Sequence, residues 1–175
     1  MNYFKNLLNK KKKILLLGKN GQLAQSFKNK FGSHPNFLVL GSSDVNFLKP
    51  KNLPYIISDF KPNIIINTCA YTNVKEAENN PGIAFIINGE ALKYIGDAAK
   101  KNKSILVHYS TDYVFDGNQA SKYKPTDKPN PINIYGKSKL LGEQNILNSG
   151  CDFFIFRISW LMSKYGNNFL KKIIL

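Results

Sequence analysis

A short apolar run that leads into a glycine turn and then into a helical pattern constrains the fold of this chain most strongly. Residues 13–17 read Lys-Ile-Leu-Leu-Leu, residues 18–21 read Gly-Lys-Asn-Gly, and Leu23 and Phe27 lie one helical turn apart in residues 22–31. A continuous apolar run of this length predicts a strand buried on both faces, which is typical of a parallel sheet. The sequence therefore predicts a strand, a tight turn and a helix in succession.

The same alternation continues along the chain. Further strands are expected at residues 37–40, 63–67, 104–109 and 153–157, and helices at residues 50–60, 73–79, 81–101 and 133–148. Pro54 favours a late start for the first of these helices, and Gly150 a stop after the last. Strands that alternate with helices predict an α/β fold with a doubly wound parallel sheet, Rossmann-like, in which ligands bind at the carboxyl ends of the strands.

The net charge of +14 is carried almost entirely by lysine, because Arg157 is the sole arginine among 175 residues. Nucleic-acid binding is one interpretation of this charge, but guanidinium groups make most specific base contacts. Compositional bias is therefore favoured, and no nucleic-acid partner is expected. A basic surface still favours anionic ligands such as dinucleotides and nucleotide sugars.

We expect residues 1–12 to form a basic N-terminal extension and residues 13–175 a single nucleotide-binding domain. The first apolar run is too short for a signal peptide, and no run reaches membrane-spanning length, which predicts a cytoplasmic protein without a membrane partner. Cys69 and Cys151 lack the spacing of a metal site, so neither a metal nor a disulfide is expected.

The glycine turn and the end of the second expected strand suggest a nucleotide cofactor. Glycine permits a positive φ and close approach of the backbone to pyrophosphate, although two glycines also occur in purely structural turns. Ser42 and Ser43 follow the second strand and could donate to a phosphate group, and the first carboxylate, Asp44, comes slightly later. Ser42 and Asp44 are the candidate cofactor-binding residues at this strand end. A strand tip without a carboxylate tolerates a 2′-phosphate, which favours NADPH over NADH. An ordinary polar loop is the alternative.

Tyr135, Lys139 and Thr111 are the main chemical signal. Tyr135 and Lys139 are four residues apart in an expected helix, so they share a face. A neighbouring ammonium group favours the phenolate, and we expect it to lower the tyrosine pKa from ~10 toward a value useful for acid–base catalysis. Thr111, after the fourth strand, is suited to polarise a carbonyl oxygen. An exposed helix face also explains such a tyrosine–lysine pair, but its combination with the glycine turn favours carbonyl reduction.

Five segments together resemble the extended short-chain dehydrogenase/reductases, and within them the dTDP-4-dehydrorhamnose reductase family. They are residues 18–23, 110–117 (Ser-Thr-Asp-Tyr-Val-Phe-Asp-Gly), 135–143, 157–160 and 166–169. The resemblance covers the chain from about residue 13 to its end. It implies reduction of the 4-keto group of dTDP-4-dehydro-6-deoxy-L-mannose with NADPH or NADH, as part of dTDP-rhamnose and polysaccharide biosynthesis.

The resemblance also implies roles for individual residues. Tyr135 would donate the proton, Lys139 would assist it and contact the cofactor, and Thr111 would polarise the carbonyl. The cofactor would contact Gly18, Asn20, Gly21, Gln22, Leu23, Thr68, Cys69 and Ala70. The substrate would contact Thr111, Asp112, Tyr113 and Trp160. Without the family, core packing explains Trp160 equally well.

Residues 69–71 read Cys-Ala-Tyr where the family commonly has a run of small residues. The resemblance further implies that most of the family's C-terminal substrate lobe would follow Leu175, and that the apolar residues 169–175 have little to pack on. Three hypotheses are therefore kept. They are a reductase represented by its cofactor-binding part, a non-catalytic module that binds cofactor and a partner, as a regulatory subunit of methionine adenosyltransferase does, and a remnant or half of a split enzyme. A homodimer or a complementing chain would be the protein partner.

Overall fold

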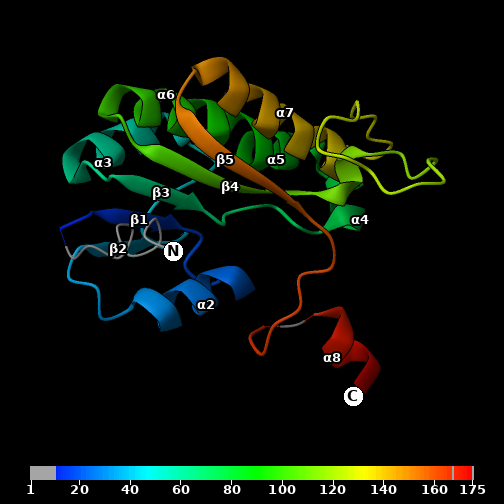
Figure 1. Cartoon of the computed structure of the whole chain (residues 1–175), viewed down its shortest axis with the longest axis horizontal. Coiled ribbons are helices and arrows are strands. Elements are labelled where there is room, and N and C mark those ends of the chain that lie inside the picture. Colours follow the sequence, from blue (N-terminus) through cyan, green and yellow to red (C-terminus); the bar gives the residue numbers. More distant parts are fainter. Residues whose placement is uncertain (1–10, 167, 175) are drawn as a thin grey trace.

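Five parallel strands form one sheet in the order β2-β1-β3-β4-β5 (Figure 1). In this computed structural model, which describes residues 11–166 and 168–174, the strands are β1 (Ile14–Leu17), β2 (Phe37–Leu40), β3 (Ile64–Asn67), β4 (Ile105–Thr111) and β5 (Asp152–Ile158). All five expected strands are present within two residues at either end. Most of the expected N-terminal extension lies outside the described residues.

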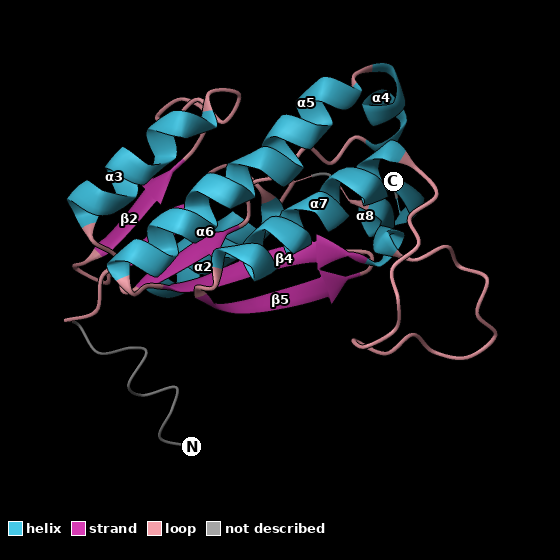
Figure 2. Ribbon diagram, turned by 90° about the horizontal axis from the view of Figure 1, so that it is seen from above, coloured by secondary structure: helices cyan, strands magenta, loops and turns pink. Residues whose placement is uncertain are grey.

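Helices cover both faces of the sheet, as the predicted doubly wound fold requires. They are α2 (Gln22–Phe31), α3 (Leu53–Phe60), α4 (Val74–Asn79), α5 (Pro81–Phe85), α6 (Ala91–Asn102), α7 (Ile134–Ser149) and α8 (Phe169–Ile174), with short 3₁₀ turns at Pro50–Asn52 and Asp112–Val114. Figures 1 and 2 show α3, α6 and α7 on one face and α2 on the other. The chain leaves β1 toward β2 and later returns to β3 on the other side, so the switch point lies between β1 and β3.

The apolar runs of β1 and β3 pack on both faces because successive side chains alternate. Leu15 and Ile65 belong to the core under α3, α6 and α7, whereas Leu16 and Ile66 belong to the core under α2. Burial on both faces explains why these central strands read as continuous apolar runs. β5 is an edge strand, and its Phe154 and Phe156 side chains are exposed.

The prediction of a single regular helix over residues 81–101 is wrong. A π-turn at Ile86–Glu90 separates α5 from α6. Its Asn88 accepts a hydrogen bond from the backbone N–H of Tyr71 at 2.8 Å and donates to the Ser138 hydroxyl at 3.0 Å. This turn thereby ties the loop after β3 to α7, and such turns often mark functional sites.

Helix ends follow the predicted signals. Residues 50–52 form a 3₁₀ turn and α3 begins at Leu53, in line with the late start that Pro54 favours. Gly150 ends α7 in the left-handed conformation, with φ +65°.

Candidate functional site

The glycine turn joins β1 to α2 at the switch point of the sheet. Gly18 has φ +103°, and a Cβ atom there would lie 2.6 Å from Thr68 Oγ1 and 2.7 Å from the Cys69 backbone nitrogen. Only glycine therefore fits this position. A Cβ atom at Gly21, which precedes α2, would meet only the Gly18 carbonyl oxygen at 3.5 Å, so space lies open beside it.

The start of α2 faces this open space. The first amide groups of a helix have no partner within the helix and carry the positive end of its dipole, which suits them to a phosphate group. No side chain caps α2 at Gly21. The turn and the first residues of α2 can thus contact a pyrophosphate through the backbone.

Asp44 corrects one premise of the cofactor prediction. The sequence places this carboxylate beyond the tip of β2, but the fold returns it to the tip, where it accepts a hydrogen bond from the Gly41 N–H at 2.9 Å. This bond, the main cause, and the nearby Lys19 ammonium, 3.4 Å away, lower the Asp44 pKa. The strand tip therefore does carry a carboxylate, which is paired with Lys19, and the premise that none lies there is wrong. Ser42 lines the adjoining cavity, whereas Asp44 does not line it.

The loop after β3 closes the other side of the turn. The Thr68 hydroxyl donates to the Leu17 carbonyl at 2.7 Å, which fixes the end of β3 against that of β1. Thr68, Cys69 and Ala70 all line the cavity beside the glycine turn. Burial raises the pKa of the Cys69 thiol to about 11, so it is a neutral wall of that cavity.

Helix α7 brings Tyr135 and Lys139 to the carboxyl edge of the sheet. Asn133 caps the helix by accepting a hydrogen bond from the Gly136 N–H at 2.7 Å. A Cβ atom at Gly136 would lie 2.2 Å from the Tyr113 carbonyl oxygen, so glycine permits α7 to start directly beside the turn that follows β4. Both side chains are buried and line the same cleft.

Thr111 ends β4 and stands next to the tyrosine. Its hydroxyl accepts a hydrogen bond from the Tyr113 N–H at 3.2 Å and donates to an Asp112 carboxylate oxygen at 3.1 Å. The Tyr113 ring packs edge-on against that of Tyr135, with centroids 5.7 Å apart. Thr111, Asp112 and Tyr113 thus surround the phenol that the sequence singled out.

The expected effect of Lys139 on Tyr135 is wrong for this structure. Burial, the main cause, raises the pKa of Tyr135, and a hydrogen bond with Thr111 only opposes it. Lys139 Nζ donates instead to the Tyr109 carbonyl oxygen at 2.7 Å and lies 3.3 Å from His108 Nε2. The shared helix face is present, but burial dominates the pKa of Tyr135, and Lys139 is not among the groups that shift it.

Most of the candidate residues converge on one cleft of about 610 Å³ at the carboxyl ends of β1, β3 and β4. A second cavity of about 360 Å³ shares Asn20, Gly21, Thr68 and Ala70 with it. Every predicted site residue except Asp44 lines one or both cavities; they are Gly18, Asn20, Gly21, Gln22, Leu23, Ser42, Thr68, Cys69, Ala70, Thr111, Asp112, Tyr113, Tyr135, Lys139 and Trp160. Two adjoining cavities lined by apolar residues and a few polar groups are typical of a binding site for a small molecule.

The segment after β5 forms the outer wall of the cleft. Trp160 has φ +48°, is 62% exposed and packs against Phe169 with ring centroids 4.3 Å apart, so ordinary core packing does not describe it. Gln22 accepts hydrogen bonds from Ser163 Oγ at 3.0 Å and Asn168 Nδ2 at 3.1 Å. Its side-chain carbonyl therefore holds this wall against the start of α2. Helix α8 leaves Ile173 and Ile174 exposed, as the apolar end of the sequence predicted.

Several buried polar residues at or beneath the cleft were not among the predicted site residues. Asn67, Asn88 and His108 are buried and hydrogen-bonded around the ends of β3 and α7. Ser110 lines the cleft, and its hydroxyl is a buried polar atom without a partner among the described residues. The polar residues Asn67, His108 and Ser110 near the ends of apolar strands were the available signal.

The burial of Lys139 makes a prediction about stability. Burial lowers its pKa from 10.5 to about 8. Between about pH 8 and pH 10.5 the unfolded chain binds more protons than the folded one. The contribution of Lys139 to stability therefore becomes more favourable as the pH rises through this range. The cost of the buried ammonium is complete below pH 8 and absent above the unfolded pKa. Replacing Lys139 by methionine should therefore benefit stability more at pH 7 than at pH 10.5, by about 3 kcal/mol.

Urea unfolding of both proteins at the two pH values measures this difference. Each protein is compared with itself at the two pH values. The contribution of the hydrogen bonds that Lys139→Met loses is the same at both and cancels from the difference. Parallel stability profiles for the native protein and Lys139→Met would contradict the prediction.

The fold and the groove at the switch point place the chain among the Rossmann-like, doubly wound dinucleotide-binding proteins. Its particular family follows from the match of residues 12–175 to the model described as the RmlD substrate binding domain, and the chain belongs to that family. The dTDP-4-dehydrorhamnose reductase of Burkholderia thailandensis is 38% identical over 162 residues, which are 93% of this chain and 54% of that protein. The corresponding reductase of Aggregatibacter actinomycetemcomitans is also 38% identical, with 93% and 56% covered.

Solved structures agree with this assignment. The dTDP-4-dehydrorhamnose reductase of Bacillus anthracis, solved in complex with NADP, superposes with a TM-score of 0.89 at 34% identity, over 94% of this chain and 59% of that one. An orthologous reductase from Clostridium acetobutylicum gives a TM-score of 0.86 at 34% identity, over 93% of this chain and 58% of its own. The chain therefore spans little more than half the length of the relatives it matches.

Among the described residues there is no membrane-spanning helix, no metal cluster and no disulfide. None of their helices is both long and apolar enough to cross a membrane. They hold no cluster of histidine, cysteine and carboxylate side chains suited to a metal ion. Cys69 and Cys151 are both free thiols.

Proposed function

We propose that this chain carries the cofactor-binding and proton-donating half of a dTDP-4-dehydrorhamnose reductase, with residues 13–175 acting as one NAD(P)-binding domain. The observation that carries the proposal is the convergence of Tyr135, Lys139 and Thr111 with the glycine turn on one cleft. The whole reaction would be NADPH- or NADH-dependent reduction of the 4-keto group of dTDP-4-dehydro-6-deoxy-L-mannose to dTDP-L-rhamnose. The relatives' names and the NADP complex support this assignment.

The residues present fit a dinucleotide. Gly18, Gly21 and the start of α2 would hold the pyrophosphate. The cavity lined by Ser42 would receive the ribose on the adenine side of the cofactor. The partnerless Ser110 hydroxyl in the cleft supports the presence of a ligand group there. When bound, the nicotinamide supplies a hydride to the carbonyl carbon.

The protein's own groups would manage the proton. The raised pKa keeps Tyr135 protonated, so its hydroxyl can donate to the carbonyl oxygen as negative charge develops there. Thr111, hydrogen-bonded within the turn that follows β4, would orient that oxygen. Asp112, Tyr113 and the exposed face of Trp160 would contact the sugar nucleotide.

Replacing Tyr135 by phenylalanine tests the proposal. We expect NADPH affinity, followed by fluorescence, to stay within a factor of about two, and turnover of the keto sugar nucleotide at 340 nm to fall by about 100-fold or more, because the proton donor is removed. Tyr55→Phe is the matched control, since Tyr55 is 77% exposed on α3, away from the cleft.

The outcomes separate the competing functions. An unchanged rate in Tyr135→Phe would show that another group donates the proton. Tight NADPH binding by the native chain without any turnover would favour the cofactor-binding module over the enzyme. Absence of NADPH and NADH binding would overturn both.

A further inference from the structure

The side chain of Gln22 joins two parts of the cleft. Gln22 is the first residue of α2, at the proposed pyrophosphate site, and its side chain contacts the outer wall of the cleft, which follows β5. In Figure 1 the segment from β5 to α8 lies on the same side of the sheet as α2. Five residues of this outer wall line the cleft; they are Trp160, Leu161, Gly166, Asn168 and Phe169.

Hydrogen bonds determine which atoms make this contact. Asn168 is 7% exposed, and its Oδ1 accepts a hydrogen bond from the Lys171 N–H at 3.2 Å. Its Nδ2 donates to the Ser163 carbonyl oxygen at 2.7 Å and lies 3.1 Å from Gln22 Oε1. Because a backbone N–H can only donate and a carbonyl can only accept, both contacts assign Nδ2 as the donor. Gln22 must therefore present its acceptor oxygen to the wall.

The Ser163 hydroxyl is a second donor to the same oxygen. It lies 3.0 Å from Gln22 Oε1 and 3.0 Å from the Tyr165 carbonyl oxygen, so these two acceptors share its single proton. A Cβ atom at Gly166 would lie 3.0 Å from Gln22 Cγ, so the wall also lies directly against the aliphatic part of the side chain. Gln22 is thus in contact with the wall through both its carbonyl and its methylene groups.

The contact extends from Gln22 to the residue proposed to face the substrate. Asn168 is followed by Phe169, and the rings of Phe169 and Trp160 pack with centroids 4.3 Å apart. Trp160 has φ +48°, a conformation that is uncommon for a residue with a large side chain and persists only where surrounding contacts hold it. The position of Trp160 therefore depends on the wall, and the wall depends on Gln22.

We propose that Gln22 is a positioning residue for the substrate: its Oε1 holds the wall that carries Trp160 against the cofactor turn. Because Gln22 belongs to the start of α2, a cofactor that fixes this turn also favours the wall position that completes the cleft. A ligand on the wall should favour cofactor binding by the same factor, since linked binding is reciprocal. This meaning for catalysis rests on the proposed reductase function, but the contact between turn and wall does not.

The fluorescence of Trp160 tests the contact in the full chain without cofactor, because Trp160 is the sole tryptophan of the sequence. Gln22→Met removes the acceptor and keeps the length of the side chain. We expect the amplitude of nanosecond motion in time-resolved anisotropy to increase about twofold or more in this variant. Gln25→Met is the matched control and should leave the anisotropy unchanged, since the Gln25 amide is on the same helix and donates to the Lys19 carbonyl at 3.4 Å instead of to the wall.

Gln22→Glu separates the two roles of this position. A carboxylate keeps the acceptor oxygen, so this variant should retain the native anisotropy in the absence of cofactor. Its negative charge next to the proposed pyrophosphate site should weaken NADPH binding by about tenfold. Gln22→Met should bind NADPH within a factor of about three of the native chain, because the backbone groups of the turn remain.

Kinetics and anisotropy give distinguishable outcomes. With the keto sugar nucleotide, Gln22→Met should raise KM about fivefold or more and change kcat by less than about twofold. Native anisotropy in Gln22→Met, an equal increase in Gln22→Glu, or a loss of kcat at unchanged KM would overturn the proposal. A chain that neither binds NADPH nor reduces the sugar nucleotide would overturn the proposed function, while the anisotropy of the cofactor-free variants would still decide whether Gln22 holds the wall.

Discussion

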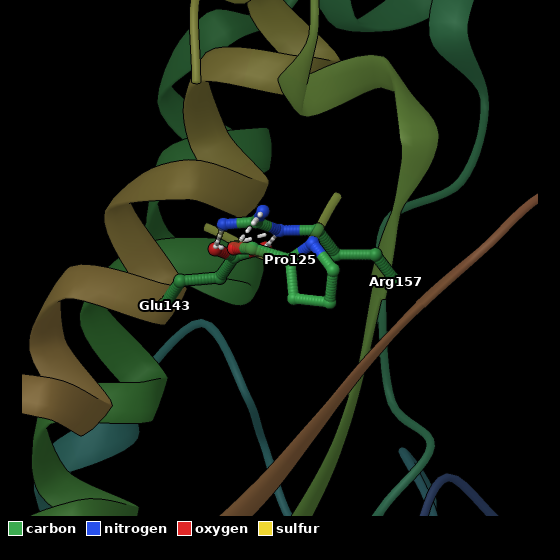
Figure 3. Close-up of polar contacts among 3 residues, drawn as sticks. All are labelled: Pro125, Glu143 and Arg157. Atoms are coloured by element: carbon green, nitrogen blue, oxygen red, sulfur yellow. Dashed lines mark hydrogen bonds and ion pairs between the residues drawn. The ribbon is translucent and has the colours of Figure 1, made fainter. Parts of the chain in front are cut away.

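Replacing Arg157 by methionine is expected to lower the free energy of unfolding by about 3–5 kcal/mol, because Glu143 would remain buried without a counter-charge. Arg157 Nε lies 3.1 Å from Glu143 Oε1, and Nη2 lies 2.7 Å from Oε2, which is a bidentate pair (Figure 3). The Glu143 side chain is only 3% exposed. Arg157 also donates to the Pro125 carbonyl at 3.3 Å and lies over the Phe115 ring at 5.0 Å.

This single arginine therefore joins β5, α7 and the loop of residues 115–131. Urea unfolding at pH 7 measures the loss, and the double variant Arg157→Met, Glu143→Leu is the matched control. Removing both charges should restore most of the stability, because the main cost is the unpaired carboxylate and not the lost attraction. Equal stability of the single and double variants would contradict this explanation.

Replacing Gly142 by alanine is expected to cost about 3 kcal/mol or more. A Cβ atom there would lie 2.2 Å from the Asn88 backbone carbonyl oxygen, which belongs to the π-turn between α5 and α6. Backbone cannot move aside as a flexible side chain does, so α7 would have to separate from this turn. Tyr135 and Lys139 lie on the same helix, so their placement in the cleft should be lost as well.

Gly82→Ala is the matched control for this substitution. Gly82 is exposed in the first turn of α5, and a Cβ atom there would meet nothing within 4 Å. Alanine has the higher helix propensity, so this variant should be neutral or slightly more stable. Thermal unfolding of both variants measures the contrast. Similar melting temperatures for Gly142→Ala and the native protein would show that α7 can shift without cost.

The fold was largely predictable because its signals are local. Residues 14–17 and 64–66 are apolar throughout, which is required of strands covered on both faces, and the doubly wound topology follows from their alternation with helices. The π-turn at Ile86–Glu90 was not predictable, because its hydrogen-bond pattern depends on packing against α7. From the sequence alone, Asn88 and Gly89 indicate only two neighbouring residues of low helix propensity.

The sequence by itself determined the fold class, the family resemblance and the residue types of the candidate site, since these depend on periodicity, spacing and motif. Only the tertiary structure determined the burial, hydrogen bonds and pKa shifts of those residues. It returned the Asp44 carboxylate to the tip of β2, and it raised the pKa of Tyr135 against the expected effect of Lys139. It also placed His108 against Lys139. The physical reason is that the charge state and the hydrogen bonds of a side chain depend on its burial and on its distance to other groups. Residues that are far apart in the sequence determine both.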